Sequence, residues 1–99
     1  MIETLVRPLT DLSGVVSTHL LERDGFVVFS SGVQAGTDEI ERWQTLLATS
    51  AADATTTLVM EAGYLILSPV SSRTLVVKCE RSCNLGLVRG TINGLQWPA

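Results

Sequence analysis

The sequence predicts an α+β fold, in which one five-stranded antiparallel sheet carries helices on both faces. Three segments place apolar residues at helical spacing, and five segments are rich in β-branched and other apolar residues. The connections between consecutive strands are short, which makes those strands antiparallel. The expected elements follow the order α-β-β-α-β-β-β-α and occupy residues 2–13, 15–22, 26–31, 38–54, 55–62, 64–70, 74–79 and 84–95.

The first helix and the first hairpin are delimited by glycines. An apolar stripe predicts the helix, but Pro8 removes a backbone donor, so the helix either begins near Arg7 or bends there. Gly14 lies where this helix should end, in a left-handed stop. Asp24-Gly25 then favours a tight hairpin, because glycine adopts a positive φ without a steric clash.

The second helix is expected to begin at an acidic cap. Thr37 or Asp38 is the candidate cap residue, and Asp38 with Glu41 resembles a capping box. Leu46 lies beside the main apolar stripe and widens the apolar surface of the helix. The stripe itself consists of Ile40, Trp43, Leu47, Ala51 and Ala54.

Length and composition indicate one domain, residues 1–99, that associates with another chain. Apolar residues make up 45% of the chain and its mean hydropathy is +0.32. A domain this small leaves much of its surface unburied, so the surplus apolar surface is better placed in a subunit interface than in water. We therefore expect a dimer or a larger assembly.

Charge and hydropathy exclude two classes of partner. The net charge is −3, Lys78 is the only lysine and the arginines are not clustered, which argues against nucleic-acid binding. The longest strictly apolar runs are about four residues, too short for a membrane span. The start of the chain also lacks the basic and apolar regions of a secretion signal, so we expect a cytoplasmic protein.

No residue pattern indicates catalysis, a metal or a cofactor. Cys79 and Cys83 lack the further ligands that zinc requires, and they are expected to be a core thiol and a reduced loop thiol. His19 has no nucleophile or acid pattern around it and is expected to be a strand residue with satisfied or partly exposed nitrogens. Phosphate-binding glycine motifs are absent as well, so the chain is not itself a GTPase or a kinase.

Two surfaces are candidate interfaces. Trp43 is either a core residue or an interface anchor, and the uncharged strand that starts at residue 55 offers no protection against edge-to-edge pairing. The candidate dimer or partner contacts are Trp43, Leu46, Leu47, Ser50, Leu58 and Met60.

The second surface is a glycine stripe on the last helix. Gly86, Gly90 and Gly94 recur every fourth residue, nearly opposite the apolar stripe, and each costs the helix about 1 kcal/mol relative to alanine. They form either a smooth groove that admits another helix or simply a marginal helix that its apolar stripe holds in place.

Three motifs carry a resemblance to a known family. The chain resembles the roadblock/dynein light chain family, whose members form an α-β-β-α-β-β-β-α sandwich related to profilin. The resemblance implies a homodimer, in which the third strands pair edge to edge and the second helices pack together. The motifs are Leu12-x-Gly14-Val15, Asp24-Gly25-x-Val27-Val28 and Asn84-Leu85-Gly86-x-Val88-Arg89.

The same resemblance implies a function without catalysis. Family members are subunits or regulators, among them dynein light chains, lysosomal scaffold subunits and bacterial partners of Ras-like GTPases. We therefore expect a homodimeric, cytoplasmic regulator or scaffold of a Ras-like small GTPase, as in a stand-alone bacterial member. The alternatives are a light-chain-like subunit of a hetero-oligomer without GTPase regulation and a small-ligand sensor.

Overall fold

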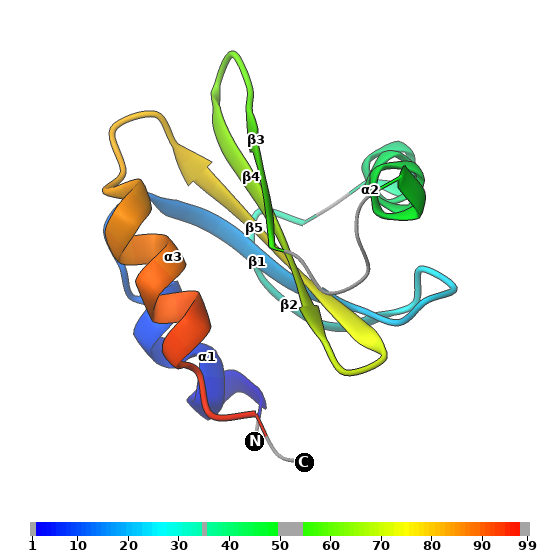
Figure 1. Cartoon of the computed structure of the whole chain (residues 1–99), viewed down its shortest axis with the longest axis horizontal. Helices are drawn as coiled ribbons and strands as arrows, with labels where there is room; N and C mark the ends of the chain where they lie inside the picture. Colours follow the sequence, from blue (N-terminus) through cyan, green and yellow to red (C-terminus); the bar gives the residue numbers. More distant parts are fainter. Residues whose placement is uncertain (1, 35, 50–54, 98–99) are drawn as a thin grey trace.

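A five-stranded antiparallel sheet forms the centre of the molecule, with two helices on one face and one on the other (Figure 1). The computed structural model describes residues 2–34, 36–49 and 55–97. This architecture confirms the fold class that the sequence predicts. The elements are α1 (Ile2–Thr10), β1 (Val15–Leu21), β2 (Val27–Gly32), α2 (Thr37–Thr49), β3 (Thr56–Val59), β4 (Gly63–Val70), β5 (Arg73–Glu80) and α3 (Leu85–Gly94).

The order of strands across the sheet is β2-β1-β5-β4-β3, so β2 and β3 are the two edges. Helices α1 and α3 lie side by side over one face, and α2 lies over the other (Figure 1). Every pairing of neighbouring strands is antiparallel.

The core has two layers because successive strand residues point to opposite faces of the sheet. On β4, Ile66 packs under α1 and α3, whereas Leu65 and Leu67 pack under α2. On β5, Leu75 and Val77 belong to the first layer and Val76 to the second. The central strands are therefore apolar on both faces.

Helix α1 is shorter than the predicted segment 2–13. It ends at Thr10, and the chain then tightens into a turn in which the Leu12 N–H donates to the Leu9 carbonyl at 3.1 Å. Pro8 lies inside the helix on its exposed side, so the helix does not begin at Arg7. Gly14 has a φ of +92°, but it lies four residues beyond Thr10, so it ends the turn that leads into β1 and not the helix that the sequence predicted it to end.

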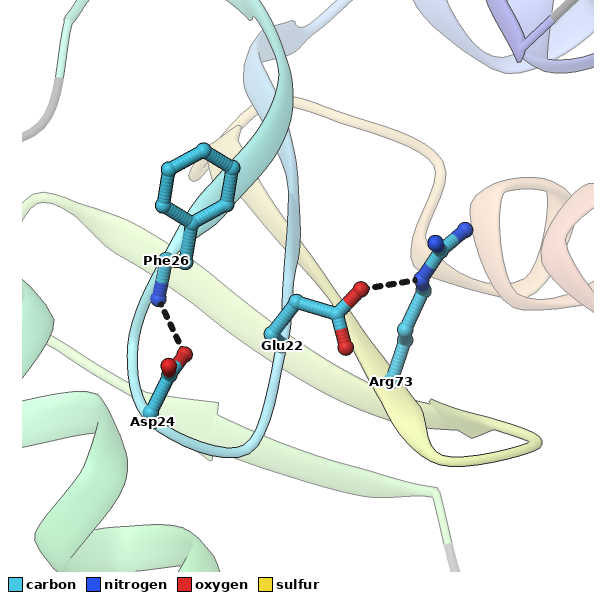
Figure 2. A network of polar contacts seen from close by, with 4 residues as sticks. All are labelled: Glu22, Asp24, Phe26 and Arg73. Atoms are coloured by element: carbon cyan, nitrogen blue, oxygen red, sulfur yellow. Dashed lines mark hydrogen bonds and ion pairs between the residues drawn. The ribbon is translucent and has the colours of Figure 1, made fainter.

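The loop of the hairpin between β1 and β2 is one residue longer than the two-residue turn of a tight hairpin. Gly25 has a φ of +91° and its N–H donates to the Glu22 carbonyl, while the Asp24 carboxylate accepts from the Phe26 N–H at 3.0 Å. Figure 2 shows this turn beside the ion pair between Glu22 and Arg73, whose atoms are 2.8 Å apart. The ion pair joins the end of β1 to the start of β5.

The predicted cap of α2, Thr37 or Asp38, is wrong by one or two residues. The helix begins at Thr37, and the Gly36 carbonyl accepts from the Ile40 N–H at 3.1 Å, which makes Gly36 the cap. The Glu39 carboxylate reaches back to the Gly36 N–H, so it takes the place that was assigned to Glu41 in the capping box. The predicted continuation of this helix through residues 50–54 lies outside the described residues.

The third strand is also shorter than the predicted segment 55–62. It spans Thr56–Val59, because a two-residue turn at Glu61 and Ala62 reverses the chain. Gly63 begins β4 rather than forming the connection, and a side chain there would overlap the Cys79 carbonyl oxygen of β5.

We predict that Gly63→Ala lowers the free energy of unfolding by more than about 1 kcal/mol, because the added methyl forces β4 away from β5. Gly90→Ala is the matched control: no atom lies within 4 Å of its new methyl, so it should stabilise α3 by up to about 1 kcal/mol. Urea unfolding of both variants measures the difference, and equal stabilities would contradict the close approach at Gly63.

Candidate interface at the β3 edge and helix α2

Within the described residues, no strand pairs with the outer side of β3, and the pairing of β3 with β4 shows where its backbone groups point. Met60 and Gly63 exchange two hydrogen bonds, with the Met60 N–H donating at 2.8 Å and the Gly63 N–H at 3.3 Å. Hydrogen-bonded and non-hydrogen-bonded pairs alternate along an antiparallel ladder. The register Val59↔Tyr64 and Thr57↔Ile66 therefore turns the N–H and C=O groups of Val59 and Thr57 away from β4, toward the open edge.

The side chains of this edge are uncharged and partly apolar. The strand reads Thr-Thr-Leu-Val, without a lysine, proline or acidic residue to discourage pairing with another strand. Val59 is 76% exposed and Met60 is 44% exposed. The edge therefore combines open backbone groups with exposed apolar surface.

The opposite edge, β2, is less suited to pairing. Its ladder with β1 shifts register between Leu20 and Leu21, which leaves Val28 as an extra residue. Gly32, at the end of the strand, has a φ of +83°. A bulged, irregular edge is one of the features that oppose strand addition. Of the two edges, only β3 is regular.

Helix α2 is anchored to the sheet by Trp43. This side chain is 3% exposed in the single chain and packs with Leu21, Leu65 and Val76. It is therefore a core residue that supports α2 from beneath, and it has little surface left for a partner.

The flanks of this cluster are only partly covered. Leu46 of α2 and Leu58 of β3 both pack against it and both stay half-buried. They come from the helix and the strand that the resemblance places at a dimer interface. Leu47 lies in the same helix, and Ser50 lies outside the described residues. That Leu46, Leu47, Ser50, Leu58 and Met60 contact a partner stays a prediction.

Two polar contacts fix the elements around this surface. The Lys78 ammonium donates to the Glu39 carboxylate at 2.9 Å, which ties the start of α2 to β5 and holds the pKa of Glu39 below its usual value. The Arg89 guanidinium donates to the Thr57 hydroxyl at 2.7 Å, which ties α3 to β3. Neither contact was foreseen, because each joins residues more than 30 positions apart.

A hollow of about 380 Å³ lies beside the turn that joins β3 to β4. Val16, Met60 and Tyr64 contribute apolar side chains to its lining, and Lys78 adds a cation. Val16 and Val59 are the surface residues that the sequence analysis missed. The alternation of Leu58, Val59 and Met60 along the strand is the signal that places Val59 on the face opposite its neighbours.

The glycine stripe lies on the exposed side of α3. Gly86, Gly90 and Gly94 are all exposed, and a methyl group built at Gly90 or Gly94 would meet no atom within 4 Å. Leu87, beside them, is 53% exposed. This is the smooth surface that the groove hypothesis requires, and its occupation by a helix stays a prediction.

The two cysteines are free thiols in the described part of the chain. Burial and the neighbouring Cys83 thiol raise the pKa of Cys79 to about 12, so Cys79 is an inert core thiol. Among the described residues there is no group of three or more histidine, cysteine, aspartate or glutamate side chains that could hold a metal ion.

Similar structures identify the fold. A roadblock/LC7 domain from Streptomyces avermitilis is 25% identical over 94% of this chain and 92% of its own, with a TM-score of 0.69. MglB from Myxococcus xanthus is 21% identical, over 93% and 85% of the two chains, with a TM-score of 0.73. The gliding protein MglB from Thermus thermophilus is 14% identical, over 91% and 78%, with a TM-score of 0.70.

The chain therefore has the roadblock/LC7 fold, which confirms the resemblance that its motifs carry. No family model matches the sequence, and no curated protein matches it either. None of the helices in the described ranges has the length and hydrophobicity that a bilayer crossing requires.

We predict that Trp43→Ala lowers the free energy of unfolding by about 3–5 kcal/mol, because it empties the contact between α2 and the sheet. Val33→Lys, at a residue that is also apolar but well exposed, should change it by less than about 0.5 kcal/mol. Urea unfolding measures the free energy of unfolding of both variants. Similar losses in the two would show that Trp43 does not anchor α2.

Proposed function

We propose that this chain is a non-enzymatic homodimeric adaptor, which acts as a regulator or scaffold of a Ras-like small GTPase in the cytoplasm. The observation that carries the proposal is the β3 edge: a regular, uncharged strand with outward-facing backbone groups at Thr57 and Val59. Beside it lie the half-buried Leu46 and Leu58. Residues 1–99 act as one domain in this proposal.

The dimer forms when two β3 strands pair antiparallel about a two-fold axis. Each strand then supplies the acceptors and donors that its partner's Thr57 and Val59 lack, and one sheet runs through both subunits. The α2 helices come together on the same face, so that Leu46, Leu47, Ser50, Leu58 and Met60 are covered. The apolar surplus in the composition supports this arrangement.

Likeness to the Mgl proteins supports the GTPase partner. The fold matches MglB and MglC of Myxococcus xanthus, and the Thermus thermophilus MglB is a gliding protein. The motifs around Gly14, Gly25 and Gly86 support the family as a whole, and the likeness to the Mgl proteins favours a bacterial GTPase-associated role over that of a dynein-type light chain. The glycine stripe of α3 is a second candidate contact for a partner helix.

We predict that Val59→Pro converts the dimer into a monomer. Proline removes the outward N–H of Val59, and an edge strand tolerates it where that N–H faces away from the sheet. Light scattering after gel filtration should give about twice 10.6 kDa for the wild type and about 10.6 kDa for the variant.

Two variants control this experiment. Val59→Thr keeps the N–H and the β-branched shape, so it should stay dimeric. Val33→Lys changes an exposed residue next to the other edge and should also stay dimeric. A dimer that survives Val59→Pro but dissociates with Val33→Lys would place the interface at β2 and contradict the proposal.

We predict that the immobilised protein captures a small GTPase from an extract of its native cells, at least tenfold better with a non-hydrolysable GTP analogue than with GDP. The two nucleotides differ in the γ-phosphate, which orders the switch loops of a GTPase. The GTPase surface that a partner binds therefore depends on the bound nucleotide. Mass spectrometry identifies the captured proteins, and capture that ignores the nucleotide would favour a light-chain-like scaffold instead.

A further inference from the structure

His19 lies at the contact between helix α2 and the sheet. It is the only histidine in the chain, and it is 1% exposed on β1. Its ring centroid is 5.4 Å from that of Trp43, the side chain that anchors α2, and the two planes are tilted by 34°. Any change in the charge of this ring is therefore felt directly beneath α2.

The two ring nitrogens of His19 have different surroundings. Nδ1 is 2.8 Å from the Ser30 hydroxyl of the neighbouring β2 strand. Nε2 is buried and has no hydrogen-bond partner. A neutral ring fits this site, with Nδ1 accepting from Ser30 at the cost of one buried, unpaired N–H on Nε2. A protonated ring would add a buried positive charge without a hydrogen-bonded counter-ion.

The charged groups around His19 come from two elements. Glu39 of α2 favours the protonated ring and Lys78 of β5 opposes it, while these two also pair with each other. Arg42, on α2, acts on Glu39. The Val33 carbonyl, just beyond β2, also favours the protonated form. Burial outweighs these effects and lowers the pKa of His19 below its ordinary value of 6.5.

We propose that His19 is a proton-operated latch for helix α2: protonation in mildly acidic solution releases the helix from the sheet while the sheet itself stays folded. Release would expose Trp43 and let the imidazolium reach water. Because α2 belongs to the proposed dimer interface, the latch would also make that interface acid-sensitive, and this last step rests on the proposed function.

The direction of the effect follows from linkage. The pKa of His19 is lowered while α2 is docked, so the neutral ring stabilises docking fully above pH 6.5. This stabilisation is lost as the pH falls below 6.5. The docking equilibrium then falls by up to tenfold per pH unit. Glu39 has a lowered pKa as well, so its contribution is lost only below its ordinary value of 4.5. Between pH 6.5 and 5 the change belongs to His19.

Amide hydrogen exchange tests the latch. After correction for intrinsic exchange rates, the protection of α2 should fall by up to about 15-fold between pH 6.5 and 5, because the loss approaches tenfold per unit only well below pH 6.5. Protection of β4 and β5 should change little. In a Trp97→Phe background, the emission of Trp43 should shift to longer wavelength in the same range, because release of α2 exposes its buried indole to water.

His19→Gln is the matched variant, because glutamine can still accept from Ser30 but cannot be protonated. The pH dependence of α2 protection should vanish in this variant and persist in Glu39→Gln. The same pH dependence in His19→Gln, or none in the wild type, would overturn the proposal.

A direct titration keeps the proposal testable even where His19→Gln does not fold. The ring proton resonances of His19 in the wild type should titrate with the same midpoint as the α2 amides, below pH 6.5. A midpoint at or above 6.5 would overturn the latch. Repeating the exchange measurement on Val59→Pro separates the two proposals, because the latch acts within one chain whether or not dimers form.

Discussion

Strands β4 and β5 bury apolar side chains on both faces of the sheet, and the rest of the structure follows from the need to cover both faces. The middle strands β4 and β5 bury side chains toward α1 and α3 and also toward α2. Two helices cover one face, but α2 alone covers the other within the described residues (Figure 1). The cover on the α2 side is therefore thinner, and Leu46 and Leu58 stay half-buried there. The surface that a second subunit would complete is a consequence of this asymmetry.

Helix α2 is also held by polar contacts. Its start is fixed by the Gly36 cap and by the ion pair between Glu39 and Lys78, and its middle rests on Trp43 over a buried histidine. Apolar packing holds the helix, while the polar groups make that hold sensitive to charge. Under the two proposals made above, this helix lies at a subunit interface as well as over a titratable ring, and assembly would then depend on proton concentration.

Much of the fold could be predicted from local patterns. Gly25 marked the first hairpin, and Gly14 marked the turn into β1 although α1 ends four residues earlier; both have the positive φ that was expected of them. The predicted ends of helices and strands were wrong where another contact determines where the element begins or ends. Glu39 takes the place of Glu41 because the cap is Gly36, three residues before it, and β3 ends early because the turn at 61–62 closes with Gly63.

The candidate site was less predictable, since it depends on pairing between distant segments. The order of the strands decides which edge is free, and no local pattern contains that order. The contact of His19 with Trp43 joins β1 to α2, so the sequence could only indicate a strand histidine and a helix tryptophan.

Isotope-edited NMR of a mixed dimer, one subunit labelled with ¹³C and ¹⁵N and the other unlabelled, tests the central claim most directly. The account predicts nuclear Overhauser effects between subunits that join β3 residues 56–59 of one chain to β3 of the other. Such effects confined to β2, or absent from a chain that stays monomeric at high concentration, would contradict it.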